Sequence, residues 1–181
     1  ELKRLWEAGD SLQYPIGPLV HLLMATGQRR GEVANARREE FDLANKLWRM
    51  PASRTKSGEP HIVPLSPLAI SIIDGLPKHK GFLFSSDGGD RPINGFSKAK
   101  RRIDAMMGET EHFVLHDIRR TVPTRLSQVR VRFEVAEMVI GHGKKGLARV
   151  YDQHQYLDEM REALDVWATE LSRIVRPDGA G

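Results

Sequence analysis

Six side chains spread along the sequence have the chemistry needed to bind and transfer a phosphoryl group. In sequence order they are Arg29, Lys56, His116, Arg119, His142 and Tyr151. Arginine presents a planar, permanently charged set of donors that matches two phosphate oxygens, while histidine and lysine can move protons at a reacting centre. The set therefore predicts a cationic site for one phosphate with a phenol beside it.

Each of these residues lies in a short, recognisable context. The contexts are TGQRRGE at 26–32, TKSG at 55–58, LHDIRRT at 115–121, IGH at 140–142, and VY at 150–151, where the tyrosine follows His142 by nine residues. One such motif is weak evidence, but five in a fixed order are specific. In that order they resemble the catalytic domain of the tyrosine recombinases, the phage-integrase family, and especially the integrases of prophages and genomic islands.

This resemblance covers the chain from about Leu2 to Val175 and implies a function. We expect a site-specific recombinase or integrase that cuts and rejoins double-stranded DNA through a covalent 3′-phosphotyrosine, without metal, ATP or another cofactor. It would act as a homo-oligomer, a tetramer on DNA. A type IB topoisomerase and a DNA-binding module that has lost cleavage are the alternatives. Six chemically competent site positions argue against the second alternative.

The two arginines are the predicted phosphate clamps. Phosphoryl transfer develops negative charge on the non-bridging oxygens, which fixed cations stabilise. Arg29 and Arg119 supply forked donors that do not deprotonate, and His142 would add another donor. Glu32, three residues after Arg29, could orient the arginines, but most glutamates at such positions are helix-start or surface residues, so we interpret its role as structural.

The remaining site residues would move protons. A tyrosine hydroxyl with its ordinary pKa of about 10 attacks poorly unless a base accepts its proton. His116 is the candidate base for Tyr151, and Lys56 is the candidate acid that protonates the departing 5′ sugar oxygen. Tyr156 is a rival nucleophile, but it follows His142 by 14 residues instead of nine. We therefore assign the attack to Tyr151.

Composition limits the class of protein. The 181 residues suit one domain with an ordinary core, and the lack of cysteine excludes disulfides and thiolate zinc sites. No apolar run approaches the roughly 20 residues that span a bilayer, and the start carries no signal-peptide pattern, so we expect no membrane association and a cytoplasmic site of action. Because the chain starts at Glu1 and not at Met, we expect it to be a fragment of a longer protein. The family resemblance implies DNA-binding domains upstream.

Charge is unevenly distributed along the chain. The net charge is only +4, but residues 91–132 hold ten basic and four acidic side chains. From Asp152 onward the balance reverses, with seven acidic side chains and three arginines. Single clusters of this kind are usually solvated helix faces. Together with the motifs, however, the basic middle indicates a face for a polyanion, and the acidic end indicates one for protein contact.

The elements that would position the first two site residues follow from local signals. An apolar helix over 19–24 should end at Gly27, leaving Arg29 just past its end, and a short helix should start near Arg30. Residues 46–50 and 61–65 read as two strands with Lys56 in the turn between them. Ser66 and Pro67 should open a helix over 68–73.

The second half reads as mainly helical. A short strand is predicted at 81–84, followed by a turn-rich loop at 85–92. A basic helix is expected at 94–106, and a helix that carries His116 and Arg119 on one face should run to Val129, kinked or delayed by Pro123. Further helices are expected at 134–140, at 147–152 with Tyr151, and at 157–175.

The predicted fold is therefore mainly α with a small antiparallel β-sheet (α+β), in a single catalytic domain over 1–181. The last helix has an apolar stripe of Leu157, Met160, Leu164, Trp167, Leu171 and Ile174. A helix with such a stripe packs its apolar face against another part of the protein or against a partner. Packing on the chain's own core is the simpler alternative, and docking on a neighbouring protomer is the other.

Overall fold

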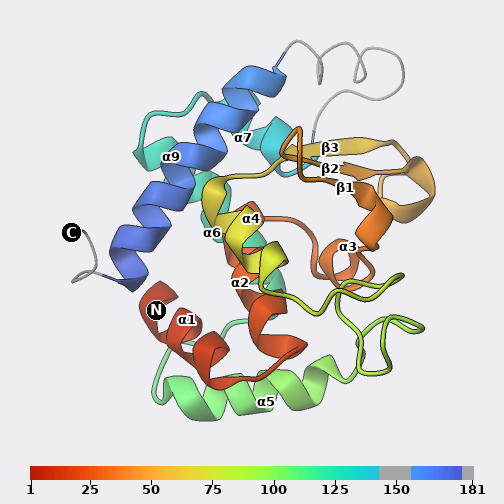
Figure 1. The fold of residues 1–181 in the computed structure, drawn as a ribbon. Helices are drawn as coiled ribbons and strands as arrows, with labels where there is room; N and C mark the ends of the chain where they lie inside the picture. The colour runs from red at the N-terminus through yellow and green to blue at the C-terminus, as the bar shows by residue number, and fades with distance from the viewer. Residues whose placement is uncertain (143–155, 177–181) are drawn as a thin grey trace.

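The chain folds mainly into helices, and one small sheet lies at one side of them (Figure 1). The structure is a computed structural model, and it describes residues 1–142 and 156–176. In sequence order its elements are α1 (Leu2–Ser11), α2 (Ile16–Thr26), α3 (Arg30–Ala34), the 3₁₀ turn η1 (Arg38–Glu40), β1 (Phe41–Asp42), β2 (Leu47–Met50), the 3₁₀ turn η2 (Ala52–Arg54), β3 (His61–Pro64), α4 (Pro67–Asp74), α5 (Phe96–Met107), α6 (Leu115–Gln128), α7 (Phe133–Val139) and α9 (Leu157–Val175). The predicted fold class is confirmed.

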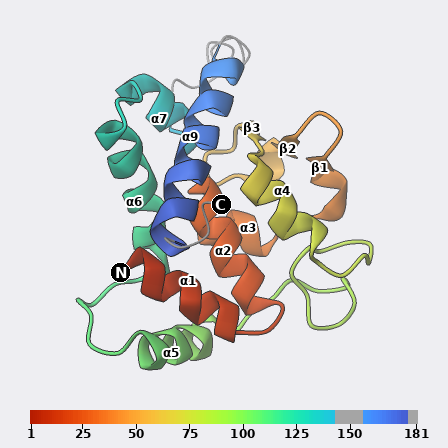
Figure 2. The same cartoon turned by 60° about the vertical axis from the view of Figure 1, so that its left-hand side comes forward.

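Helix α2 forms the centre of the core because it is apolar on nearly every side. Leu19, Leu22 and Met24 are at most 1% exposed. The helix contacts α1, α3, α4, α6 and α9, which surround it in the two views of Figures 1 and 2. Gly27 ends it in the left-handed conformation, with φ of 65°, as predicted. Arg29 therefore lies just past the end of the most deeply buried helix.

The sheet has three antiparallel strands in the order β1-β2-β3. Strands β2 and β3 agree with the two predicted strands, and Trp48 pairs with Val63 in their register. The two-residue strand β1 is too short to show an alternating pattern and was not predicted. The strand predicted at 81–84 is wrong, because Phe82 forms only an isolated bridge with Arg37. Leu83 and Phe84 in this segment are buried in the core, but they belong to a loop and not to a strand.

Pro123 lies inside α6 and does not delay its start. The helix begins at Leu115, eight residues earlier, and is continuous to Gln128. The proline ring removes the N–H that would bind the carbonyl of Arg119 one turn before it. Burial of Ile118, Val122 and Leu126 against the core keeps the helix together on both sides of the proline. The expected delay was therefore wrong.

Helix α9 packs on the chain's own core. Its apolar stripe is buried, with Leu164 and Trp167 each 1% exposed. The indole N–H of Trp167 donates to the carbonyl of Met24 at 2.8 Å, which ties α9 to α2. Neither α9 nor any other helix in the described ranges is long and apolar enough to cross a membrane.

Candidate active site

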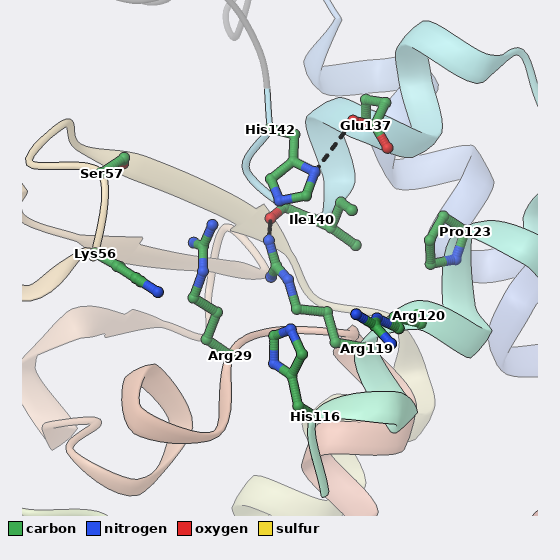
Figure 3. Close-up of a pocket in the computed structure, with 10 residues that line it drawn as sticks. All are labelled: Arg29, Lys56, Ser57, His116, Arg119, Arg120, Pro123, Glu137, Ile140 and His142. Carbon is green, nitrogen blue, oxygen red and sulfur yellow. Dashed lines mark hydrogen bonds and ion pairs between the residues drawn. The ribbon is translucent and has the colours of Figure 1, made fainter. Parts of the chain in front are cut away.

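A cavity of about 630 Å³ lies where the ends of α2 and α7, the start of α6 and the β2-β3 turn meet (Figure 3). Its lining residues are Arg29, Lys56, Ser57, His116, Arg119, Arg120, Pro123, Glu137, Ile140 and His142. Five of the six predicted site residues thus surround one space, although they extend from position 29 to position 142. The sixth, Tyr151, and the helix predicted around it lie outside the described residues.

Arg119 is held deep in the cavity wall by two helix ends. Its side chain donates from Nη1 to the carbonyl of Gly27 at 3.3 Å and from Nη2 to the carbonyl of Ile140. The residue is 3% exposed, and burial followed by the charge of Arg29 lowers the pKa of Arg119 to about 10. That pKa still leaves the guanidinium protonated at neutral pH. The site therefore contains a fixed charge with further N–H donors for a ligand.

Arg29 is oriented by a buried carboxylate. Its Nη1 donates to Oε1 of Glu32 at 3.0 Å, and its backbone N–H donates to Oε2 at 3.2 Å. The side chain of Glu32 is only 4% exposed. The sequence interpretation of Glu32 as a structural residue at a helix start agrees with the backbone contact. The alternative that was set aside, an orienting contact with the arginine, is also present. The signal that was available is an arginine and a glutamate three residues apart where a helix begins.

Lys56 is exposed on the turn between β2 and β3, as predicted. Its side chain extends toward the side of the cavity that Arg29 lines (Figure 3). The hydroxyl of Thr55 donates to the carbonyl of Glu59 at 2.6 Å and closes the turn. The backbone N–H of Lys56 donates to Oε1 of Glu32 at 3.4 Å. Glu32 therefore contacts both the turn and the arginine across from it.

His116 lies in the first turn of α6, and Arg119 follows one turn later, so both reach the cavity from one helix face as predicted. Desolvation, followed by the positive charges of Arg119 and Arg120, lowers the pKa of His116 below its ordinary 6.5. The imidazole is therefore neutral at pH 7. A neutral ring has one nitrogen free to accept a proton.

His142 follows the glycine that ends α7, and a carboxylate orients its ring. Nδ1 lies 3.1 Å from Oε2 of Glu137, and the backbone N–H of His142 donates to the Glu137 carbonyl at 2.8 Å (Figure 3). With Nδ1 engaged by an acceptor, Nε2 is the nitrogen available to a ligand. Sequence reasoning missed Glu137, since a glutamate five residues before a histidine has no distinctive pattern.

The cavity is strongly cationic. Among the described residues, Arg29, Lys56, Arg119 and Arg120 line it together with a single carboxylate, that of Glu137. In the part of the chain that the structure describes, no group of three or more His, Asp or Glu side chains could hold a metal ion. Fixed guanidinium groups with a lysine and two imidazoles form a site suited to a phosphodiester anion.

Comparison with known families agrees with this geometry. The sequence matches the model of the phage integrase family over residues 1–157. The chain belongs to the phage integrase family. Among its relatives are prophage integrase IntA of Escherichia coli K12, 29% identical over 80% of this chain and 36% of the relative, and prophage integrase IntZ of the same strain, 28% identical over 96% and 43%. The chain thus spans about two fifths of the length of these phage integrases.

Solved structures share the fold. The XerH site-specific recombinase, in a post-cleavage complex with its palindromic difH substrate, is 22% identical with a TM-score of 0.60. That match covers 92% of this chain and 51% of XerH. The XerA recombinase gives a TM-score of 0.56 at 19% identity, over 87% of this chain and 61% of XerA. The overall fold is therefore shared with these recombinases.

Proposed function

We propose that this chain is the catalytic domain of a site-specific DNA recombinase, an integrase that cuts and rejoins DNA strands through a covalent 3′-phosphotyrosine. The observation that carries the proposal is the convergence of Arg29, Lys56, His116, Arg119 and His142 on one cationic cavity. Metal and ATP are not needed in this scheme. The arginines stabilise the developing charge, and the phosphotyrosine keeps a phosphodiester bond that a 5′-hydroxyl can later attack.

In the proposed cleavage step, the hydroxyl oxygen of Tyr151 attacks the scissile phosphorus. A bond forms between that oxygen and phosphorus, and the bond from phosphorus to the 5′ oxygen breaks. The phenol proton passes to His116, whose lowered pKa keeps it neutral and ready to accept it. The departing oxygen takes a proton from Lys56, because an alkoxide is too strong a base to leave unprotonated.

The clamps act on the non-bridging oxygens. Arg119 is held by two backbone carbonyls and Arg29 by Glu32, so neither has to reorganise as charge develops. His142, oriented by Glu137, adds a donor through Nε2 in its doubly protonated form. Loss of one preorganised donor typically lowers the rate roughly 100- to 1,000-fold. Substitution of either arginine should therefore reduce cleavage more than DNA binding.

Double-stranded DNA is the proposed substrate, and a tetramer on DNA is the proposed assembly. The cationic cavity supports the first, as does the palindromic difH substrate bound to a structural neighbour, the XerH site-specific recombinase. We further propose that the longer protein carries DNA-binding domains upstream. The cytoplasmic site of action stays a prediction from the sequence.

A trapped covalent adduct tests the function. The probe is a DNA duplex with a nick beside the scissile phosphate and randomised bases around it, so that the target need not be known. Incubation in EDTA should leave protein attached to DNA, and the recovered sequences then define the substrate. Tyr151→Phe should abolish the adduct. Tyr156→Phe is the matched control and should retain it, since Tyr156 packs partly buried against the core.

Failure of the wild-type chain to form any adduct would favour a DNA-binding module without cleavage. Joining of the cleaved strand to a second duplex would separate recombination from the simple nicking and resealing of a topoisomerase.

A further inference from the structure

Arg54 lies two residues before Lys56, and its guanidinium is bound on several sides by the protein. Nε and Nη2 donate to the two carboxylate oxygens of Glu40 at 2.5 and 2.7 Å, and Nη2 also donates to the backbone carbonyl of Glu32 at 3.1 Å. The side chains of Arg54 and Glu40 are 14% and 5% exposed. This two-point pairing fixes the orientation as well as the position of the arginine.

Glu40 is itself anchored in the sheet. The indole N–H of Trp48, a fully buried residue of β2, donates to Oε2 of Glu40 at 2.9 Å. Arg54 is thereby tied through Glu40 to β2, and through the Glu32 carbonyl to α3. These contacts hold the start of the turn that follows Arg54.

The same network contacts both sides of the catalytic cavity. Oε1 of Glu32 accepts from the guanidinium of Arg29 and from the backbone N–H of Lys56. A second cavity, of about 540 Å³, is lined by Arg54 together with Arg29, Lys56 and His116. Arg54 thus lies beside both the turn with Lys56 and the phosphate clamp.

Arg54 is not suited to clamp a phosphate itself. Its charge is balanced by the carboxylate of Glu40, and its Nε and Nη2 donors already bind protein oxygens. Any effect of an Arg54 substitution on cleavage should therefore act through a catalytic residue in the same segment of the chain. That residue is Lys56, whose exposed side chain depends on the backbone for its placement.

We propose that Arg54, paired with Glu40, is a positioning residue for proton donation to the departing oxygen, because it fixes the turn from which Lys56 acts. The inference rests on the proposed function and on Lys56 as the acid. In the step concerned, the bond from phosphorus to the 5′ oxygen breaks, and the Lys56 ammonium gives its proton to that oxygen.

A substrate that does not need the acid separates this role from a general structural one. The DNA carries sulfur in place of the bridging 5′ oxygen, and a thiolate, with a pKa of about 8.5 for its thiol, leaves without protonation. Arg54→Gln should cleave ordinary DNA about 10- to 100-fold more slowly than wild type, yet cleave the sulfur DNA within about threefold of the wild-type rate. DNA affinity should be unchanged.

Three comparison variants define the pattern. Lys56→Ala should be rescued by sulfur in the same way. Arg29→Gln should stay slow on both substrates, because its role is on the non-bridging oxygens. Arg49→Gln removes an exposed cation from the same sheet and should leave both rates unchanged.

Arg54→Gln leaves the buried carboxylate of Glu40 without its cation, which can destabilise the fold. The double variant Arg54→Met with Glu40→Gln removes the stranded charge and keeps an acceptor for Trp48. It should show the same rescue by sulfur, with an unfolding transition close to that of wild type.

Equal slowing of the Arg54 variants on both substrates would overturn the inference, and so would an unchanged rate on ordinary DNA. A Lys56→Ala variant that sulfur does not rescue would also overturn it, because Arg54 would then have no acid to place. Absence of any adduct with wild-type protein would instead refute the proposed function, so the two failures are distinguishable.

Discussion

Replacing Glu32 by glutamine tests whether a buried carboxylate holds a catalytic arginine in place. The change keeps the shape of the side chain but removes its charge and turns one acceptor oxygen into an NH₂ donor. In the native chain one oxygen accepts from the Arg29 guanidinium at 3.0 Å and the other from the Arg29 backbone N–H at 3.2 Å. Glutamine can satisfy only one of these two donors.

The expected size follows from burial. Removing one partner of a fully buried ion pair costs about 3–5 kcal/mol. Glu32 is 4% exposed but Arg29 is 20% exposed, so the stranded guanidinium keeps part of its hydration. A hydrogen bond to a charged group contributes about 1.5–3 kcal/mol. We therefore expect Glu32→Gln to lower the free energy of unfolding by about 2 kcal/mol, a value within the range for a hydrogen bond to a charged group.

Urea unfolding and single-turnover cleavage measure the two consequences. With an m-value of about 2 kcal/mol/M, the unfolding midpoint should fall by about 1 M. Cleavage should slow by about 10- to 100-fold, less than for loss of the whole donor. Glu39→Gln is the matched control, because that carboxylate is 64% exposed and lies 3.7 Å from Arg37, which is too far for a hydrogen bond. A Glu32→Gln protein with wild-type stability and rate would refute the reasoning.

Three further outcomes are expected. Because desolvation and nearby arginines lower the pKa of His116 below 6.5, single-turnover cleavage should fall with decreasing pH only below 6.5, where the base becomes protonated, and His116→Gln should remove that limb of the pH profile. Ser66→Ala removes the side-chain oxygen that accepts from the N–H of Ala69 at the start of α4, and should lower the unfolding free energy in urea by about 1 kcal/mol. Trp167→Phe removes the donor to the Met24 carbonyl, and thermal or urea unfolding should show a loss of about 2 kcal/mol.

The parts of the fold that the sequence predicted are those with strong local signals. Gly27 ends α2 because a left-handed residue suits a helix end, and Ser66 caps α4 because its side chain accepts from a free backbone N–H. Both signals act within a few residues. The loop at 81–84 was misread as a strand because its apolar residues are buried by tertiary contacts, and apolar runs of four residues do not distinguish these cases.

For the site, the sequence identified the side chains that face the cavity but not those that hold them. His116 and Arg119 were found from the motif that resembles the tyrosine recombinases, and their spacing of three correctly placed both on one helix face. An orienting role for Glu32 was weighed and set aside, because a glutamate at such a position is usually a helix-start or surface residue. Glu137 was missed because its separation of five residues from His142 has no distinctive pattern. Tyr151 was assigned from its interval after His142, and its role stays a prediction.

The two halves of the site are joined through backbone carbonyls, which explains why sequence patterns cannot show how they meet. Arg119 binds the carbonyls of Gly27 and Ile140, and the buried amide of Gln28 donates to those of Thr26 and Val139 at 2.8 Å each. Every residue has a carbonyl, so these acceptors leave no trace in residue type. These hydrogen bonds nevertheless tie the end of α2 to the end of α7, and thereby fix the position of Arg29 relative to His142. The precision of the cavity is consequently a property of helix packing, and substitutions in the core between these helices should alter the site without touching any residue that lines it.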